Sequence, residues 1–164
     1  MIHLEIEIEA GGWTEIDGVE ALCREAAAAA VAAHPGPEAA EALAATLLLT
    51  DDEAVRELNR AWRGQDKATN VLSFPAPAMP GSPRHLGDVA LAWETVAAEA
   101  GQEGKPVRHH TAHLVVHGLL HLLGHDHGTD EEAGAMEGLE TAALAGLGVP
   151  DPYRSGSPEA VLQP

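Results

Sequence analysis

The residues of this chain best suited to chemistry are histidines, and seven of its ten histidines fall between positions 109 and 127. His117 and His121 are four residues apart, so on a helix they lie on one face, one turn above each other. Two imidazoles in that relation can bind one metal ion. Gly124 predicts the end of the helix, because glycine tolerates the left-handed backbone of a C-terminal cap. The chain can then turn back and bring a third ligand to the ion.

Spacing alone leaves the third ligand open. His113 shares the helix face, but it is eight residues from His121, which is roughly 12 Å along the helix axis. Both cannot bind one ion through zinc–nitrogen bonds of about 2 Å. The candidates beyond the helix are His125, Asp126 and His127. Three protein ligands with an open fourth position are typical of a catalytic zinc site rather than of a structural one.

The residue that follows the first histidine bears on the reaction. Zinc proteases carry H-E-x-x-H, in which the glutamate is the general base. Here that position is Gly118, so peptide hydrolysis by that route lacks its base. A metal ion would still activate water or polarise an oxygen. A nearby arginine or lysine would suit a phosphodiester, whose transition state gathers charge on its oxygens, and the sequence therefore favours phosphodiester over peptide hydrolysis.

Hydrophobic periodicity predicts the elements that must position these histidines. Apolar and acidic residues alternate in one predicted strand and a continuous apolar run forms another, and two shorter strands follow. The strands are expected over 2–9, 43–50, 70–74 and 87–92, and the helices over 19–33, 51–62, 93–100, 107–123 and 129–147. Thr129 and Glu132 form a capping-box pattern at the last helix. This order predicts an α+β fold with a small mixed sheet covered by helices. The H-x3-H-x5-H spacing that starts on the helix over 107–123 makes the expected fold that of a zincin-like metallo-hydrolase.

Length and composition predict the domain organisation and the compartment. We expect a single domain over residues 1–148 and a flexible C-terminal tail over residues 149–164, which is rich in Pro, Gly and Ser. No apolar run approaches the roughly 18 to 20 residues that cross a bilayer. The single cysteine, Cys23, excludes an intrachain disulfide. We therefore expect a cytoplasmic protein with no membrane partner.

The charge of the chain argues against broad binding to nucleic acid, because its formal net charge is −17 and phosphate contacts need cations. The basic residues are nevertheless unevenly placed. Arg56, Arg60, Arg63 and Lys67 are four of the nine basic residues and lie within twelve positions. From charge alone an ordinary solvated helix face is the better interpretation of this cluster, and a local cationic surface is the alternative.

Three segments of the chain resemble the YbeY family of bacterial ribosomal-RNA maturation factors. They are HGLLHLLGHDH over 117–127, LNRAWRGQDKATNVLSFP over 58–75 and LGDV over 86–89, and GVPDPY over 148–153 also matches. Their order and separation match the family over roughly residues 45–153, whereas the N-terminal third is not diagnostic. Two positions depart from the family pattern: Trp62 and His125 stand where the family usually has tyrosine.

The resemblance implies a zinc-dependent, single-strand-specific endoribonuclease. Such an enzyme acts in maturation of the 3′ end of small-subunit ribosomal RNA and in ribosome quality control. The expected partners are single-stranded or ribosomal RNA and the small ribosomal subunit or its associated proteins. A non-catalytic, zinc-containing ribosome assembly factor is the alternative, and a metalloprotease is less favoured because of Gly118.

The resemblance also implies roles for individual residues. One zinc ion is expected on His117, His121 and His127, although other divalent ions suit three histidines as well. An RNA-handling role falls on Arg63, whose guanidinium fits phosphate in two-pronged fashion. Further candidates for substrate contacts are Arg60, Lys67 and Ser73. Apart from the resemblance, Asp126 is a candidate general base, and the sequence does not assign that role. The roles of His113 and His125 stay open.

Overall fold

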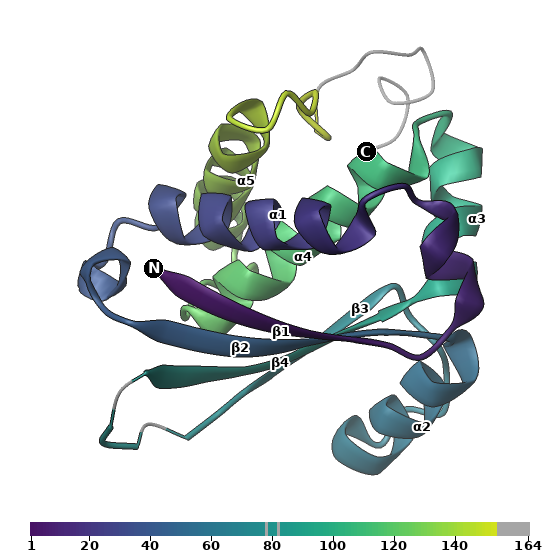
Figure 1. Cartoon of the computed structure of the whole chain (residues 1–164), viewed down its shortest axis with the longest axis horizontal. Helices are drawn as coiled ribbons and strands as arrows, with labels where there is room; N and C mark the ends of the chain where they lie inside the picture. Colours follow the sequence, from purple (N-terminus) through teal and green to yellow (C-terminus); the bar gives the residue numbers. More distant parts are fainter. Residues whose placement is uncertain (78, 82, 154–164) are drawn as a thin grey trace.

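A mixed four-stranded sheet is the frame of the fold in this computed structural model, which describes residues 1–77, 79–81 and 83–153 (Figure 1). The strands are β1 (Ile2–Ile8), β2 (Leu43–Thr50), β3 (Val71–Pro75) and β4 (Arg84–Ala92). The α-helices are α1 (Val19–Ala33), α2 (Asp52–Arg63), α3 (Trp93–Glu103), α4 (Val107–Leu122) and α5 (Asp130–Ala145). Two short 3-10 helices, η1 (Gly11–Glu15) and η2 (Pro37–Ala40), flank α1.

The sheet has the order β1-β2-β4-β3. The first three of these strands run parallel, and β3 pairs antiparallel with β4 at the edge. This arrangement confirms the predicted α+β fold with a small mixed sheet. Because β3 is an edge strand, one row of its backbone groups does not pair within the sheet and can meet side chains from other elements.

The predicted bounds agree best where a local signal marks an end. The helix over 19–33 and the strand over 43–50 begin and end as expected. Asp51 caps α2 by accepting a hydrogen bond from the backbone N–H of Ala54 at 2.8 Å, and Thr129 caps α5 by accepting one from Glu132 at 3.1 Å. β4 begins three residues earlier than expected, because Arg84 pairs with Leu43 of β2. Such pairing between distant residues leaves no local mark in the sequence.

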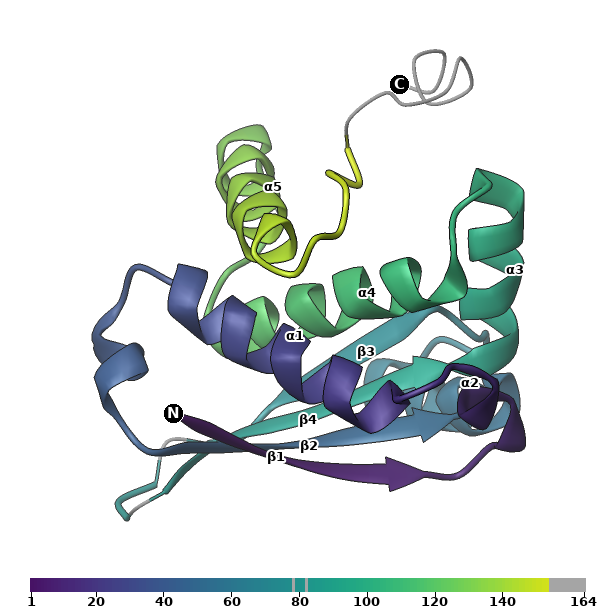
Figure 2. The ribbon, with the colours of Figure 1, turned by 45° about the horizontal axis from the view of Figure 1, so that its top comes forward.

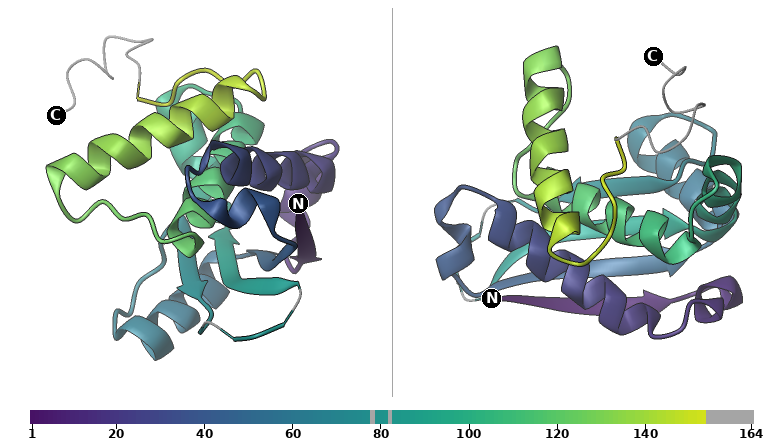
Figure 3. Two further views of the ribbon diagram at one scale, coloured as in Figure 1. Left: turned by 90° about the vertical axis from the view of Figure 1, so that its left-hand side faces the viewer. Right: turned by 90° about the horizontal axis from the view of Figure 1, so that it is seen from above.

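Helices cover both faces of the sheet. α1 and α4 lie on one face, and α2 packs on the other (Figure 1). α5 packs on α1 and α4, farther from the sheet (Figures 2 and 3). Alternate residues of β2 fill the larger core, among them Leu43, Leu47 and Leu49, while Val55 and Leu72 belong to the smaller core beneath α2. None of the helices described is long and apolar enough to cross a membrane.

The expected C-terminal tail lies partly outside the described residues, which end at Tyr153. The residues from 149 to 153 pack on the helices. The Val149 side chain is buried, and Asp151 accepts a hydrogen bond from the Thr141 hydroxyl at 3.1 Å. The structure therefore continues a few residues beyond the predicted start of the tail at residue 149, and a flexible segment stays a prediction for residues 154–164.

The close approach of α4 to the sheet depends on Gly118. A Cβ atom at this position would lie 2.7 Å from Cγ1 of Val89 and 3.3 Å from Oγ of Ser73. Val89 is fully buried and β-branched, so its side chain cannot turn aside to make room. Gly118, which stands where zinc proteases carry their glutamate base, is thus also the residue that lets α4 pack closely on β3 and β4.

This contact predicts opposite effects of alanine at two helical glycines. In Gly118→Ala, overpacking against Val89 costs about 1 to 3 kcal/mol, against a gain of at most about 1 kcal/mol from alanine's helix propensity. Gly138→Ala in α5 is the matched control, because its added Cβ would have no atom within 4 Å. Urea unfolding should therefore show a destabilised Gly118→Ala protein and a stabilised Gly138→Ala protein. Equal stability of the two variants would contradict the packing argument.

Candidate metal centre

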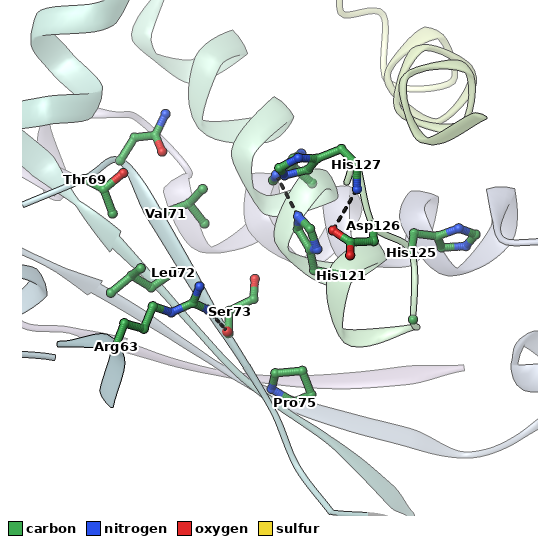
Figure 4. Close-up of a pocket in the computed structure, with 13 residues that line it drawn as sticks. Arg63, Thr69, Val71, Leu72, Ser73, Pro75, His121, His125, Asp126 and His127 are labelled. Atoms are coloured by element: carbon green, nitrogen blue, oxygen red, sulfur yellow. Dashed lines mark hydrogen bonds between the residues drawn. The ribbon is translucent and has the colours of Figure 1, made fainter. Parts of the chain in front are cut away.

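Three histidines meet at the C-terminal end of α4. His117 and His121 lie in the last two turns of the helix. His127 comes from the loop that follows and lies near His121 (Figure 4). One side-chain nitrogen from each of the three lies within 4.8 Å of the others. The Nε2 atoms of His117 and His121 are 3.1 Å apart, close to the roughly 3.3 Å that a tetrahedral zinc site with bonds of about 2.05 Å requires. The donor set and its spacing therefore fit a metal ion.

The turn after α4 carries His127 to the other two histidines. The helix ends at Leu122, and Gly124 has a φ of 100°, which a side chain would disfavour. The backbone N–H of His125 donates back to the Leu120 carbonyl at 3.0 Å, so the chain reverses over the last helical turn. Asp126 then accepts a hydrogen bond from the His127 backbone N–H at 2.7 Å and holds the loop. The predicted helix stop at Gly124 is confirmed.

A buried carboxylate orients His117. The Glu140 side chain on α5 is only 1% exposed, and its Oε2 accepts a hydrogen bond from Nδ1 of His117 at 3.1 Å. Its Oε1 accepts hydrogen bonds from Nε2 of His113 and, at 2.6 Å, from the Tyr153 hydroxyl. A proton on Nδ1 leaves Nε2 of His117 with its lone pair facing His121. This carboxylate–histidine pair is the arrangement that fixes the tautomer of metal-binding histidines.

The surroundings of Glu140 and His121 set the charge of each side chain. Burial raises the pKa of the Glu140 carboxyl, but hydrogen bonds from His113, His117 and Tyr153 outweigh that effect and hold the pKa at about 2. The residue is therefore a carboxylate at neutral pH. Burial lowers the pKa of His121, and the neighbouring His117 and His127 lower it further. His121 is thus neutral, which is the form of imidazole that binds metal.

The other histidines near the cluster have different partners. Nε2 of His125 lies 2.7 Å from Nδ1 of His34, and Nε2 of His34 lies 2.9 Å from a carboxylate oxygen of Glu38. His125 therefore points away from the three-histidine cluster and ties the loop to the segment after α1. His113 reaches Glu140 rather than the cluster, as its position along the helix predicts. Neither residue joins the three-histidine cluster: His125 contacts His34, and His113 contacts Glu140.

A cleft opens beside the three histidines. Its volume is about 570 Å³, and α4 with the following loop faces β3 across it. Arg63, from the end of α2, lines the cleft together with Ser73 and donates a hydrogen bond from Nη2 to the Ser73 backbone carbonyl at 2.7 Å. The Ser73 hydroxyl in turn donates to the Gly118 carbonyl at 3.2 Å. Ser73 thus links Arg63 to the helix that carries two of the histidines.

The structure divides the basic cluster that the sequence singles out. Arg63 lines the cleft, whereas Arg60 forms an ion pair with Glu57 on the exposed face of α2 and Arg56 pairs with Asp66. Neither Arg60 nor Lys67 is among the described residues that line the cleft. Their predicted substrate contacts stay predictions, and their placement makes them more distant candidates than Arg63.

Glu140 is the residue of this site that the sequence analysis missed. The sequence carries a signal for it, because Met136, Glu140, Ala143 and Leu144 are spaced to fall on one helical face. In the structure all four are buried. A charged residue on such an apolar face requires a partner in the interior. The sequence does not show that the partners are two histidines of α4 and a tyrosine beyond α5, because those contacts join residues up to 27 positions apart.

The fold and the cluster define a mixed α+β protein with a candidate three-histidine metal centre beside an edge strand. Residues 13–148 match the model of the family described as Endoribonuclease YbeY. The chain therefore belongs to the YbeY family. The match includes most of the N-terminal third, which the sequence motifs do not diagnose.

Relatives agree over nearly the whole chain. It is 50% identical to Endoribonuclease YbeY of Paramagnetospirillum magneticum over 159 residues, which cover 93% of this chain and 96% of the relative. It is 51% identical to Endoribonuclease YbeY of Rhodopseudomonas palustris over 154 residues, which cover 91% and 80% of the two chains. A solution structure from Thermotoga maritima is 19% identical, with a TM-score of 0.56 over 94% of this chain and 99% of the other, and shares the fold.

The Glu140 contacts predict how a substitution would change the affinity of the cluster for added zinc, taken as a test metal. In Glu140→Gln, an amide replaces the carboxylate that accepts from His117, so we expect zinc affinity to fall by about 10- to 100-fold. The measurement is competition with a chromogenic chelator, with circular dichroism to verify the fold. Glu137→Gln on the same helix is the matched control and should bind zinc as the unaltered protein does. Equal affinities in all three proteins would remove the orienting role.

Proposed function

We propose that this protein is a metal-dependent endoribonuclease that cuts single-stranded RNA. The observation that carries the proposal is the cleft in which His117, His121 and His127 face Arg63. A phosphodiester needs both a Lewis acid and a cation beside its oxygens. Membership of the YbeY family, whose model and relatives carry the name endoribonuclease, supports the same reaction.

His117, His121 and His127 would hold one zinc ion in this proposal. When bound, the ion supplies Lewis acidity toward a phosphoryl oxygen and lowers the pKa of a coordinated water toward about 7. Glu140 keeps Nε2 of His117 free for coordination, and the depressed pKa of His121 keeps its imidazole neutral. With three protein nitrogens as ligands, the site would keep a position open for substrate or water, as catalytic zinc sites do.

Arg63 would bind the phosphate on the opposite wall of the cleft. Its hydrogen bond to the Ser73 carbonyl fixes one guanidinium nitrogen and leaves the other donors for phosphate oxygens. Ser73 then acts as a positioning residue, because its hydroxyl holds the strand to α4. Asp126 lines the same cleft and is the candidate general base.

Gly118 weighs against a metalloprotease. A Cβ atom there would already lie 2.7 Å from Cγ1 of Val89 and 3.3 Å from Oγ of Ser73, so a glutamate at this position would push α4 away from the sheet. The proposed substrate is therefore RNA, with the 3′ end of small-subunit ribosomal RNA as the expected target. The proposal further places the protein in the cytoplasm, as one domain over residues 1–148 that works with the small subunit or its associated proteins in RNA maturation and quality control.

The ligand assignment predicts loss of zinc and of cleavage in His121→Ala. Removing one of three ligands leaves two nitrogens, which should reduce zinc below stoichiometric content and abolish RNA cleavage. Elemental analysis measures the metal, and a labelled single-stranded RNA measures cleavage after stringent removal of contaminating nucleases. His85→Ala, at an exposed histidine of β4, is the matched control and should keep both.

The outcomes separate the candidate functions. Full zinc content in His121→Ala would contradict the ligand assignment. Stoichiometric zinc in the unaltered protein without RNA cleavage would favour the non-catalytic assembly factor. Peptide cleavage without RNA cleavage would favour the metalloprotease.

The phosphate role predicts a selective defect in Arg63→Ala. Loss of a cation that meets charge in the transition state typically costs about 100-fold or more in kcat, so cleavage should fall by that order while zinc content stays complete. Arg56→Ala on the same helix is the control, because Arg56 is exposed and already paired with Asp66. Steady-state cleavage kinetics provide the measurement, and an unchanged rate in Arg63→Ala would remove the phosphate contact.

A further inference from the structure

Trp62, the chain neighbour of the cleft residue Arg63, exposes its side chain to solvent. Tryptophan is usually well buried, yet Trp62 is 73% exposed at the end of α2. The other two tryptophans behave as expected: Trp13 is fully buried, and Trp93 packs against it with ring centroids 5.1 Å apart. An exposed indole in a chain with only five Phe, Trp and Tyr residues is a feature that the fold does not require.

Trp62 belongs to a small surface that reaches the cleft. Its ring centroid lies 6.3 Å from that of Phe74, and the guanidinium carbon of Arg63 lies 5.6 Å from the centroid of the Phe74 ring. Phe74 stands on the edge strand between Ser73 and Pro75, both of which line the cleft. We call Trp62, Arg63 and Phe74 the aromatic platform. Within this platform, Arg63 lines the cleft and the Trp62 ring is exposed to solvent.

The acidic charge of the protein makes electrostatic attraction of RNA weak, so binding needs a contribution that does not depend on cations. The chain carries a formal net charge of −17, and two cations of α2 are paired with carboxylates: Arg56 with Asp66 and Arg60 with Glu57. Attraction of phosphates by these arginines is therefore weak. Stacking of a base on an aromatic ring needs no cation, and each stacked base strengthens binding by about 5- to 150-fold.

We propose that Trp62 is a stacking site for a nucleobase of single-stranded RNA whose neighbouring phosphate lies at Arg63. The inference rests on the proposed function and specifies how that site selects its substrate. A base inside a duplex has both faces covered by its neighbours, whereas an unpaired base can offer a face to an aromatic side chain. Stacking on Trp62 thus gives the cleft a preference for single strands through a residue that does not touch the metal.

The test compares binding of two probes by full-length, metal-loaded proteins. One probe is a fluorescein-labelled oligoadenylate of about ten nucleotides, and the other is an abasic chain of the same length. Rapid-mixing anisotropy reports binding before cleavage. In Trp62→Leu, affinity for oligoadenylate should fall by roughly 5- to 100-fold, while Trp62→Phe keeps most of it. Met79→Leu, at another exposed apolar residue, should bind as the unaltered protein does.

Cleavage kinetics and the abasic probe complete the design. The abasic chain should bind the unaltered protein and Trp62→Leu equally, and oligoadenylate cleavage by Trp62→Leu should show a raised KM with kcat retained. Equal binding of oligoadenylate by both proteins overturns the stacking site, as expected if Trp62 contacts a protein partner instead. Stacking-dependent binding without any cleavage supports this site and overturns the nuclease function. RNA cleavage together with binding that does not depend on Trp62 supports the nuclease function and overturns the stacking site.

Discussion

The packing of α4 on the sheet at Gly118 is the contact on which the candidate site depends. Because this residue has no side chain, the helix comes close enough for its carbonyl to accept a hydrogen bond from the Ser73 hydroxyl. The Ser73 carbonyl binds Arg63 at the same time. Ser73 of the edge strand therefore joins the Arg63 guanidinium to α4 at Gly118. His117 directly precedes Gly118, so the same contacts position Arg63 relative to His117. The approach of α4 to β3 across the cleft therefore depends on a packing contact, and the loop over 124–127 completes the lining.

The sequence predicts those parts of the site that are encoded locally. The spacing of His117 and His121 places them on one helical face, and Gly124 marks the end of that helix, so both features could be predicted without the structure. Spacing alone could not choose the third residue, and only the family resemblance pointed to His127. His127 joins the cluster while His125 turns away to His34, a residue 91 positions earlier in the chain. Only the tertiary structure brings that competing partner close.

Glu140 illustrates the same limit from the opposite direction. Its place on a buried helical face could be predicted, and with it the need for interior partners, but not their identity. The carboxylate joins α5 to His113 and His117 of α4 and to Tyr153 beyond α5. The segment that composition marks as the start of a tail thus contributes a hydroxyl to the support of the candidate centre. Composition predicts mobility only where no such long-range contact forms.

The acidic balance of the chain then becomes compatible with an RNA substrate. Broad electrostatic affinity would hold the protein on any nucleic acid, paired or not, because every phosphate attracts a cation equally. Here one arginine faces the cleft while Arg56 and Arg60 are neutralised by ion pairs on α2. In the proposed binding mode, productive binding combines several weak terms at one place: coordination at the histidines, the Arg63 contact and the aromatic platform. A single strand that meets all three would be selected in this mode, and a duplex that offers only phosphates would not.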